Sequence, residues 1–188
     1  FVDFSPASGV LFRALDGFAA LAARLEREVR RGVEQATRRG AAPAPAAPSG
    51  RAPGTAPVFS PGPSSAAELL PYNRRLLIKS LLRGAAMACY APDAPANADT
   101  PAHAAMLRAL RQVFLFAPAF GGGLFALAAS LVADLVHHDP LSFPLLEAAD
   151  VPEAFLAAVA AGVAPGPDAV GAVPQTLGAL CLNARGLA

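Results

Sequence analysis

The sequence contains only two cysteines, and they lie far apart. Cys89 and Cys181 have no Cys-x-x-Cys partner and no histidine at a metal-ligand spacing, so the sequence predicts neither a zinc site nor a disulfide framework. Neither has a general base nearby in the sequence that would mark a nucleophile, and we expect both to be small core residues. This cysteine usage favours a reducing compartment, the cytoplasm or the nucleus.

The chain also lacks a surplus of charge of either sign. It carries 15 basic and 14 acidic side chains, for a formal net charge of +1. A dedicated nucleic-acid binder carries a basic surplus, so the composition does not favour nucleic acid as a partner. The sequence shows no charged start followed by an apolar stretch and a small-residue cleavage site, and the start of the longer protein is not visible in it. The chain opens on Phe1 rather than on a methionine, and we expect it to be a segment of a longer protein.

One stretch without charged residues has the length of a membrane span, from 113 to 133. Pro118 and the triplet Gly121-Gly122-Gly123 interrupt it, and a new amphipathic pattern begins after them, as expected at a turn between two helices. Two buried helices therefore explain the stretch better than a membrane-embedded fragment, and we expect no membrane partner.

Strand-type alternation is absent, and apolar residues instead recur every three or four positions, which predicts an all-α fold. The first helical pattern has an apolar stripe of Leu15, Phe18, Leu21, Leu25 and Val29, with Arg24, Arg27, Glu28 and Arg31 on other faces. Further helices are expected near 66–90, 101–117, 122–138, 143–149, 150–161 and 168–183. Pro101 suits a first helical turn, whereas Pro174 predicts that the last helix is split in two.

Two of these helices differ in how much of their surface is apolar. The apolar side of the helix at 66–90 is expected to comprise Leu69, Leu70, Leu76, Leu77, Leu81 and Ala85. The helix at 122–138 is apolar almost all round, with a polar stripe limited to Ser130, Asp134, His137 and His138, so we expect it to be the most buried. Asp150 and Glu153 stand close to the spacing of a capping box at the start of another helix.

Residues 40–65 differ in composition from the rest of the chain. They consist mainly of alanine, proline, glycine and serine, which cannot form a core, and we expect a disordered, flexible Ala/Pro-rich linker. It would separate an N-terminal helical segment, 1–39, from a helical domain, 66–188. Short helices in succession joined by Gly/Pro turns favour stacked helical repeats over a four-helix bundle.

Two motifs could suggest chemistry but have simpler interpretations. His137 and His138 are adjacent, and neighbouring helical side chains point about 100° apart, so they cannot both face one metal ion. We interpret them as a polar helix end next to the C-terminal dipole. Gly121-Gly122-Gly123 lacks the strand and the Lys-Ser/Thr of a phosphate-binding loop, and close helix packing is the expected reason for its glycines. The sequence therefore predicts no catalytic, cofactor-binding or metal-binding residue.

Arg75, Lys79 and Arg83 form the one candidate partner surface. They are spaced four residues apart on one helix face, with no acidic residue at the matching offsets. Like charges at this spacing slightly disfavour a helix, so an interaction elsewhere could offset them. A solvated face or an acidic neighbour in the longer protein is one interpretation, and a binding patch for an acidic partner is the other.

Four stretches in the second part of the chain carry a family resemblance. They are PYNRRLLIKSLLR at 71–83, FGGGLFALAA at 120–129, DLVHHDPLSFP at 134–144 and PQTLGALCLN at 174–183. Together they resemble the armadillo-like region near the N-terminus of giant HECT-type E3 ubiquitin ligases, especially the plant-type ligases. The resemblance runs in collinear order over residues 15–39 and 70–188, and the Ala/Pro-rich stretch is where the sequence departs from it.

The resemblance implies an armadillo/HEAT-like α-solenoid segment without catalytic activity of its own. The longer protein would transfer ubiquitin from a conjugating (E2) enzyme to substrate lysines through a C-terminal HECT cysteine, a role that neither Cys89 nor Cys181 inherits. The partners implied are protein substrates and neighbouring helical repeats, with E2 and ubiquitin bound elsewhere and no cofactor. A free-standing armadillo- or HEAT-type adaptor is the alternative.

Overall fold

The computed structural model describes residues 11–12, 15–44, 70–89, 100–162 and 167–182, and the regular elements in these residues are all helical. The helices are α2 (Gly17–Arg38), α3 (Tyr72–Cys89), α4 (Pro101–Leu115), α5 (Ala117–Phe120), α6 (Gly122–His138), α7 (Phe143–Ala148), α8 (Val151–Ala160) and α9 (Pro167–Leu180), with a short 3₁₀ turn, η2, at Pro140–Ser142. The predicted all-α class is confirmed.

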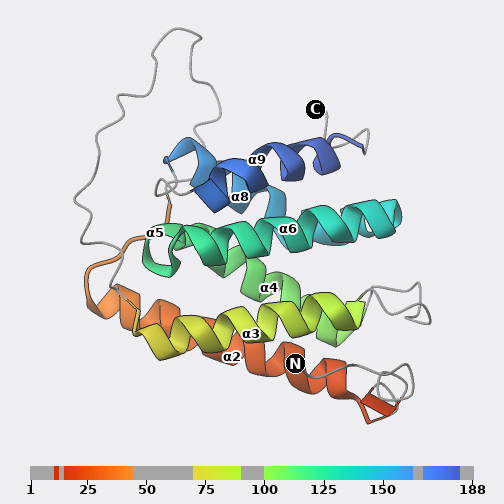
Figure 1. Ribbon diagram of the computed structural model, residues 1–188, viewed down its shortest axis with the longest axis horizontal. Coiled ribbons are helices and arrows are strands. Elements are labelled where there is room, and N and C mark those ends of the chain that lie inside the picture. The colour runs from red at the N-terminus through yellow and green to blue at the C-terminus, as the bar shows by residue number, and fades with distance from the viewer. Residues whose placement is uncertain (1–10, 13–14, 45–69, 90–99, 163–166, 183–188) are drawn as a thin grey trace, which may run out of the picture.

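The long helices form two rows, and the chain alternates between them (Figure 1). One row is α2, α4 and α8, in which each helix packs against the next; the other is α3, α6 and α9. Across the rows, α2 contacts α3 and α4 contacts α6. Figure 1 shows α3, α6 and α9 running side by side, with the short α5 next to the start of α6. Helices α2, α3, α4 and α6 thus each have neighbours both along their own row and across it.

Helix α6 lies at the centre of this arrangement and packs against α3, α4, α5 and α9. Its buried positions are Leu124, Phe125, Ala126, Ala128, Ala129, Leu131, Val132, Ala133 and Val136. Ser130 and Asp134 are half-buried and His137 and His138 are exposed, so the predicted polar stripe is on the side with most solvent. The helix is deeply buried as expected, but it is not the most buried one, since nine of its 17 residues are buried against six of ten in α8.

Three phenylalanines join the two rows in the core. Phe114, Phe125 and Phe155 come from α4, α6 and α8 and are all fully buried. Their ring centroids lie 5.4 to 5.7 Å apart, with two edge-to-face contacts and one stacked contact. These geometries place the positive edge of one ring on the negative face of another or offset two faces, which adds to the hydrophobic gain.

Helix α9 is continuous from Pro167 to Leu180, so the predicted break at Pro174 is wrong. Proline removes one backbone donor, which leaves the carbonyl of Val170 without its usual partner. Both Pro174 and Val170 are exposed, and the altered turn therefore lies on the solvent side of the helix. On the buried side, the Thr176 hydroxyl donates to the Ala129 carbonyl of α6 at 3.0 Å and to Ala172 at 2.9 Å.

The buried face of α3 also differs from the prediction. Ile78, Leu82 and Ala85 are fully buried, whereas Leu76 and Leu77 are 50% and 37% exposed. The leucines of this helix offered two possible apolar faces, and packing against α2 and α6 selected the face that contains Ile78. Leu70 is buried as expected, Leu81 is half-buried, and Leu69 lies outside the described residues.

Helix α2 buries most of its predicted apolar stripe, and two residues, Leu15 and Glu28, differ from the prediction. Leu25 and Val29 are fully buried, and Phe18 and Leu21 pack at the edge of the core. Leu15 precedes α2 and is exposed. Glu28, which the sequence placed on an outer face, is buried instead.

Two turns have backbone conformations that the sequence did not reveal. Gly121 has φ 85°, and a Cβ added there or at Gly123 would meet nothing within 4 Å, so positive φ rather than close packing explains Gly121. Asp150 has φ 53° and makes no capping hydrogen bond, so the predicted capping box is wrong. Its left-handed conformation turns the carboxylate towards Arg111, 3.6 Å away. Gly162, with φ 77°, follows the end of α8 at Ala160 and its cap at Ala161.

The charge-free stretch at 113–133 is divided among α4, α5 and α6. Among the described residues, no helix combines the length and apolar character that crossing a membrane would need. Most of the predicted linker, from residue 45 onwards, lies outside the described residues, so the division at 1–39, 40–65 and 66–188 stays a prediction.

Candidate partner surface on helix α3

An exposed stripe runs along α3, on the side away from the core. It consists of Tyr72, Leu76, Lys79, Arg83 and Met87, which we call the α3 stripe. The spacings of four, three, four and four residues place these side chains on one face of the helix. Tyr72 is 69% exposed and Met87 is 56% exposed, and both basic residues are exposed.

The structure places two of the three predicted basic residues, Arg75, Lys79 and Arg83, on this stripe. Lys79 and Arg83 lie on the α3 stripe, while Arg75 is half-buried at its margin. The sequence of α3 contains no acidic residue. Among the described residues, no hydrogen bond or ion pair involves the side chain of Lys79 or Arg83. The exposed cations therefore have no described counter-charge.

Glu28 fixes the side of α3 that faces α2. Its carboxylate is 5% exposed and has three arginines around it: Arg24 at 3.1 Å, Arg31 at 3.1 Å and Arg74 at 3.5 Å. Arg74 is the only member of this group from α3. A carboxylate buried without partners would be strongly unfavourable, so this ion pair opposes rotation of α3 about its axis. The α3 stripe is thereby held outwards.

Close approach of the two helices reinforces this orientation. A Cβ added at Gly84 of α3 would come within 2.9 Å of Leu21 Cδ1 on α2. The atom is the end of the partly buried Leu21 side chain, so a larger residue at position 84 would require that side chain to move. Sequence reasoning had assigned no role to Gly84.

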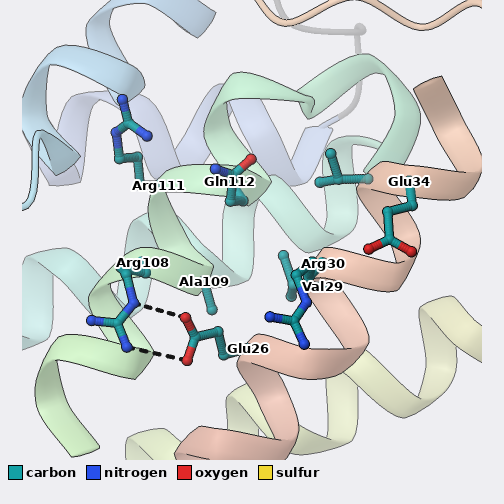
Figure 2. A pocket seen from close by; sticks show the side chains of 9 residues that line it. Glu26, Val29, Arg30, Glu34, Arg108, Ala109, Arg111 and Gln112 are labelled. Carbon is teal, nitrogen blue, oxygen red and sulfur yellow. Dashed lines mark hydrogen bonds and ion pairs between the residues drawn. The ribbon is translucent and has the colours of Figure 1, made fainter. Parts of the chain in front are cut away.

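A groove between α2 and α4 has a volume of about 250 Å³. Val29, Val33 and Ala109 contribute its apolar lining, and Gln112 adds a polar side chain. Figure 2 shows Glu26 and Arg108 joined by two hydrogen bonds, 2.7 and 3.2 Å long. The hydrogen bond to Glu26 raises the pKa of Arg108. Arg30, Arg111 and Glu34 add charges of both signs, so the groove does not select a ligand of one charge.

The adjacent histidines lie at the end of a helix. His137 and His138 are in the last turn of α6, and His137 Nδ1 lies 2.8 Å from the Ala133 carbonyl oxygen, which confirms the polar helix end. The described residues contain no cluster of three or more His, Cys, Asp or Glu side chains able to hold a metal.

The core position expected for Cys181 is wrong. Helix α9 ends at Leu180, and the next two residues form an exposed turn, so Cys181 is an exposed free thiol. Cys89 is the last residue of α3, and its side chain lies outside the described part of the structure.

Comparisons with known proteins cover the whole chain. Residues 1–188 match the family described as Domain of Unknown Function (DUF913). The chain is 36% identical over 194 residues to the E3 ubiquitin-protein ligase UPL2 and 35% identical over 187 residues to UPL1, both from Arabidopsis thaliana. A third relative, the E3 ubiquitin-protein ligase ptr1 of Schizosaccharomyces pombe, is 24% identical over 115 residues, which is 61% of this chain and 4% of the relative.

The two plant alignments include 100% of this chain but only 5% of each relative. No solved structure is significantly similar to the chain. The resemblance to plant-type ubiquitin ligases that the sequence indicated is confirmed by these alignments, and the full-length match to the family shows that the chain belongs to the DUF913 family.

Proposed function

We propose that this chain is a non-catalytic scaffold segment of a HECT-type E3 ubiquitin-protein ligase and helps to position protein substrates. The observation that carries the proposal is the alignment of the whole chain with two plant proteins named as E3 ubiquitin-protein ligases. Since the chain spans 5% of their length, ubiquitin transfer through a HECT cysteine belongs to the remainder of such a protein. E2 and ubiquitin would bind there too, in the cytoplasm or nucleus.

The packing of the helices supports the scaffold part of the proposal. Helices that alternate between two rows along the chain are typical of stacked helical hairpins, the organisation of armadillo- and HEAT-like α-solenoids. In such a stack each layer contacts its neighbours, and the outer layers need further layers to cover them.

Exposed apolar residues on the last helix fit this interpretation. Val170 and Leu177 of α9 are 70% and 36% exposed, and their separation of seven residues puts them on one face. The neighbouring helical repeats of the longer protein are the partners that would cover this face.

The test replaces this segment in a full-length ligase of the family with an unrelated helical repeat segment of equal length. Two readouts are compared: ubiquitin thioester formation on the HECT cysteine, and ubiquitination of a known substrate. We expect the thioester to form normally and substrate ubiquitination to fall. Unchanged substrate ubiquitination would contradict the scaffold role.

A second measurement tests the absence of transfer chemistry in the segment itself. The isolated chain is incubated with ubiquitin-charged E2, and a reducible adduct is sought on non-reducing gels. The exposed thiol of Cys181 makes this test stringent, because access is not the limiting factor. We expect no adduct, and one on Cys181 or Cys89 would overturn the non-catalytic assignment.

A further inference from the structure

We infer that the α3 stripe docks an acidic amphipathic helix of a partner protein, one with carboxylates at its centre and apolar side chains at both ends. This inference rests on the proposed scaffold function and specifies the chemistry of a partner. It concerns the outward face of α3, which the packing against α2 and α6 leaves exposed.

The spacing of the α3 stripe favours a helical partner. The stripe residues Tyr72, Leu76, Lys79, Arg83 and Met87 are three or four residues apart, a spacing that lets a second helix pack along a first. From Tyr72 to Met87 the stripe rises about 22 Å, since each residue of an α-helix rises about 1.5 Å. A partner helix of similar length would contact the stripe over all of it.

The order of side chains along the stripe determines the partner's own pattern. Tyr72 and Leu76 lie at one end and Met87 at the other, with Lys79 and Arg83 between them. Two cations one turn apart repel each other, and α3 has no acidic residue to offset them. Carboxylates at the centre of the partner helix would remove this repulsion, while apolar residues at its ends would cover the tyrosine, the leucine and the methionine.

The surface is held in place before any partner binds. The Arg74–Glu28 ion pair and the close contact at Gly84 fix α3 against α2, so the stripe loses little conformational entropy on binding beyond that of its side chains. This rigidity favours recognition of a defined helix over adaptation to varied segments.

Helices that bind membrane surfaces distribute their basic residues differently from the α3 stripe. In helices that lie on membranes, the basic residues flank a continuous apolar face. In the α3 stripe the basic residues stand in the middle of that face, so insertion of Leu76 and Met87 into lipid would take Lys79 and Arg83 with them. The arrangement therefore favours a protein helix.

The experiment measures binding of the 188-residue chain to a fluorescent 18-residue peptide, equal in length to α3. The peptide has leucines at the end positions of its contact face and glutamates at the central ones. A control peptide has glutamines in place of those glutamates. We expect the acidic peptide to bind, to become helical on binding, and to bind more weakly as salt increases. Equal affinity for the glutamine peptide, or no binding of the acidic peptide, would overturn the inference.

Variants locate the binding site. Lys79→Glu with Arg83→Glu should weaken binding roughly tenfold or more, because two attractions become repulsions. Arg27→Glu with Arg38→Glu is the matched control, since both residues are exposed cations on α2, away from the stripe, and the change in net charge is the same. Leu76→Ala should weaken binding through lost apolar contact. Equal effects of the two charge reversals would overturn the inference.

Two further measurements examine the competing occupants. The acidic peptide should still bind the chain when anionic phosphatidylserine vesicles are present. If the vesicles bound the α3 stripe and displaced the peptide from it, the inference would be overturned in favour of a membrane. Light scattering should show a monomer, and self-association abolished by Lys79→Glu with Arg83→Glu would assign the stripe to a second copy instead. Peptide binding involves no ubiquitin transfer, so its failure would leave the ligase assignment intact, and failure of the segment replacement would leave peptide binding intact.

Discussion

Replacing Glu28 by glutamine tests whether a buried ion pair holds α3 against α2. Glutamine keeps the size of the side chain but removes the charge that three arginines share. Arg24 and Arg31 are about half exposed and can turn towards water, so their loss contributes little. Arg74 is only 27% exposed and loses its charged acceptor. A hydrogen bond to a charged group contributes about 1.5–3 kcal/mol, and we expect a destabilisation of about 2 kcal/mol.

Glu26→Gln is the matched control, two residues away on the same helix. Glu26 also accepts hydrogen bonds from an arginine, Arg108, but the side chains of this pair are 31% and 56% exposed. Exposed pairs contribute about 0.2–1 kcal/mol, so this variant should lose less than about 1 kcal/mol. Urea unfolding followed by circular dichroism gives both values. Equal losses for the two variants would refute the argument that burial of Glu28 makes its ion pairs important.

The remaining predictions concern the core and one titrating group. Leu131 is 2% exposed, so Leu131→Ala should destabilise the chain by about 2–5 kcal/mol in urea melts, and Ser130→Ala by less than about 0.5 kcal/mol; similar values would place α6 at the periphery. Thr176→Val should cost about 1 kcal/mol through the lost hydroxyl bond to Ala129, and a neutral result would show that this bond does not stabilise the α6–α9 contact. Burial lowers the pKa of His103 below its ordinary 6.5, so the unfolded chain binds a proton more readily and stability should fall as pH decreases below about 6.5. His103→Gln should reduce that slope in thermal melts between pH 5 and 7, and an unchanged slope would contradict the assignment.

Helix positions could be predicted because they depend on local pattern. The expected helix at 122–138 coincides with α6, and Pro101 occupies the first turn of α4 behind an N-terminal cap from Thr100. Proline, glycine and the apolar period act within a few residues, so their effects can be inferred from sequence. Pro174 is the exception, because tertiary contacts of α9 with α6 outweigh one missing hydrogen bond.

The orientation of each helix could not be predicted in the same way. Cys181 was expected in the core because no general base lies near it in the sequence and free cysteines are usually small buried residues, yet α9 ends just before it. Leu76 and Leu77 were expected to face inwards, but the adjoining Ile78 does. A helix with leucines on two faces has more than one possible buried side, and only its neighbours decide between them.

The arginines of α3 show how a long-range partner divides one run of charge into two roles. Arg75 shares the four-residue spacing of Lys79 and Arg83, whereas the adjacent Arg74 does not, and local spacing gives no indication of a partner for Arg74. Arg74 nevertheless reaches Glu28, which is 46 residues earlier in the chain, and becomes part of the contact between α2 and α3. The ion pair of Arg74 and the burial of Ile78 and Leu82 turn the same side of α3 inwards, which leaves Lys79 and Arg83 facing outwards. The basic surface of α3 is therefore a consequence of apolar packing and of a buried carboxylate on another helix, which agree on the side that faces inwards.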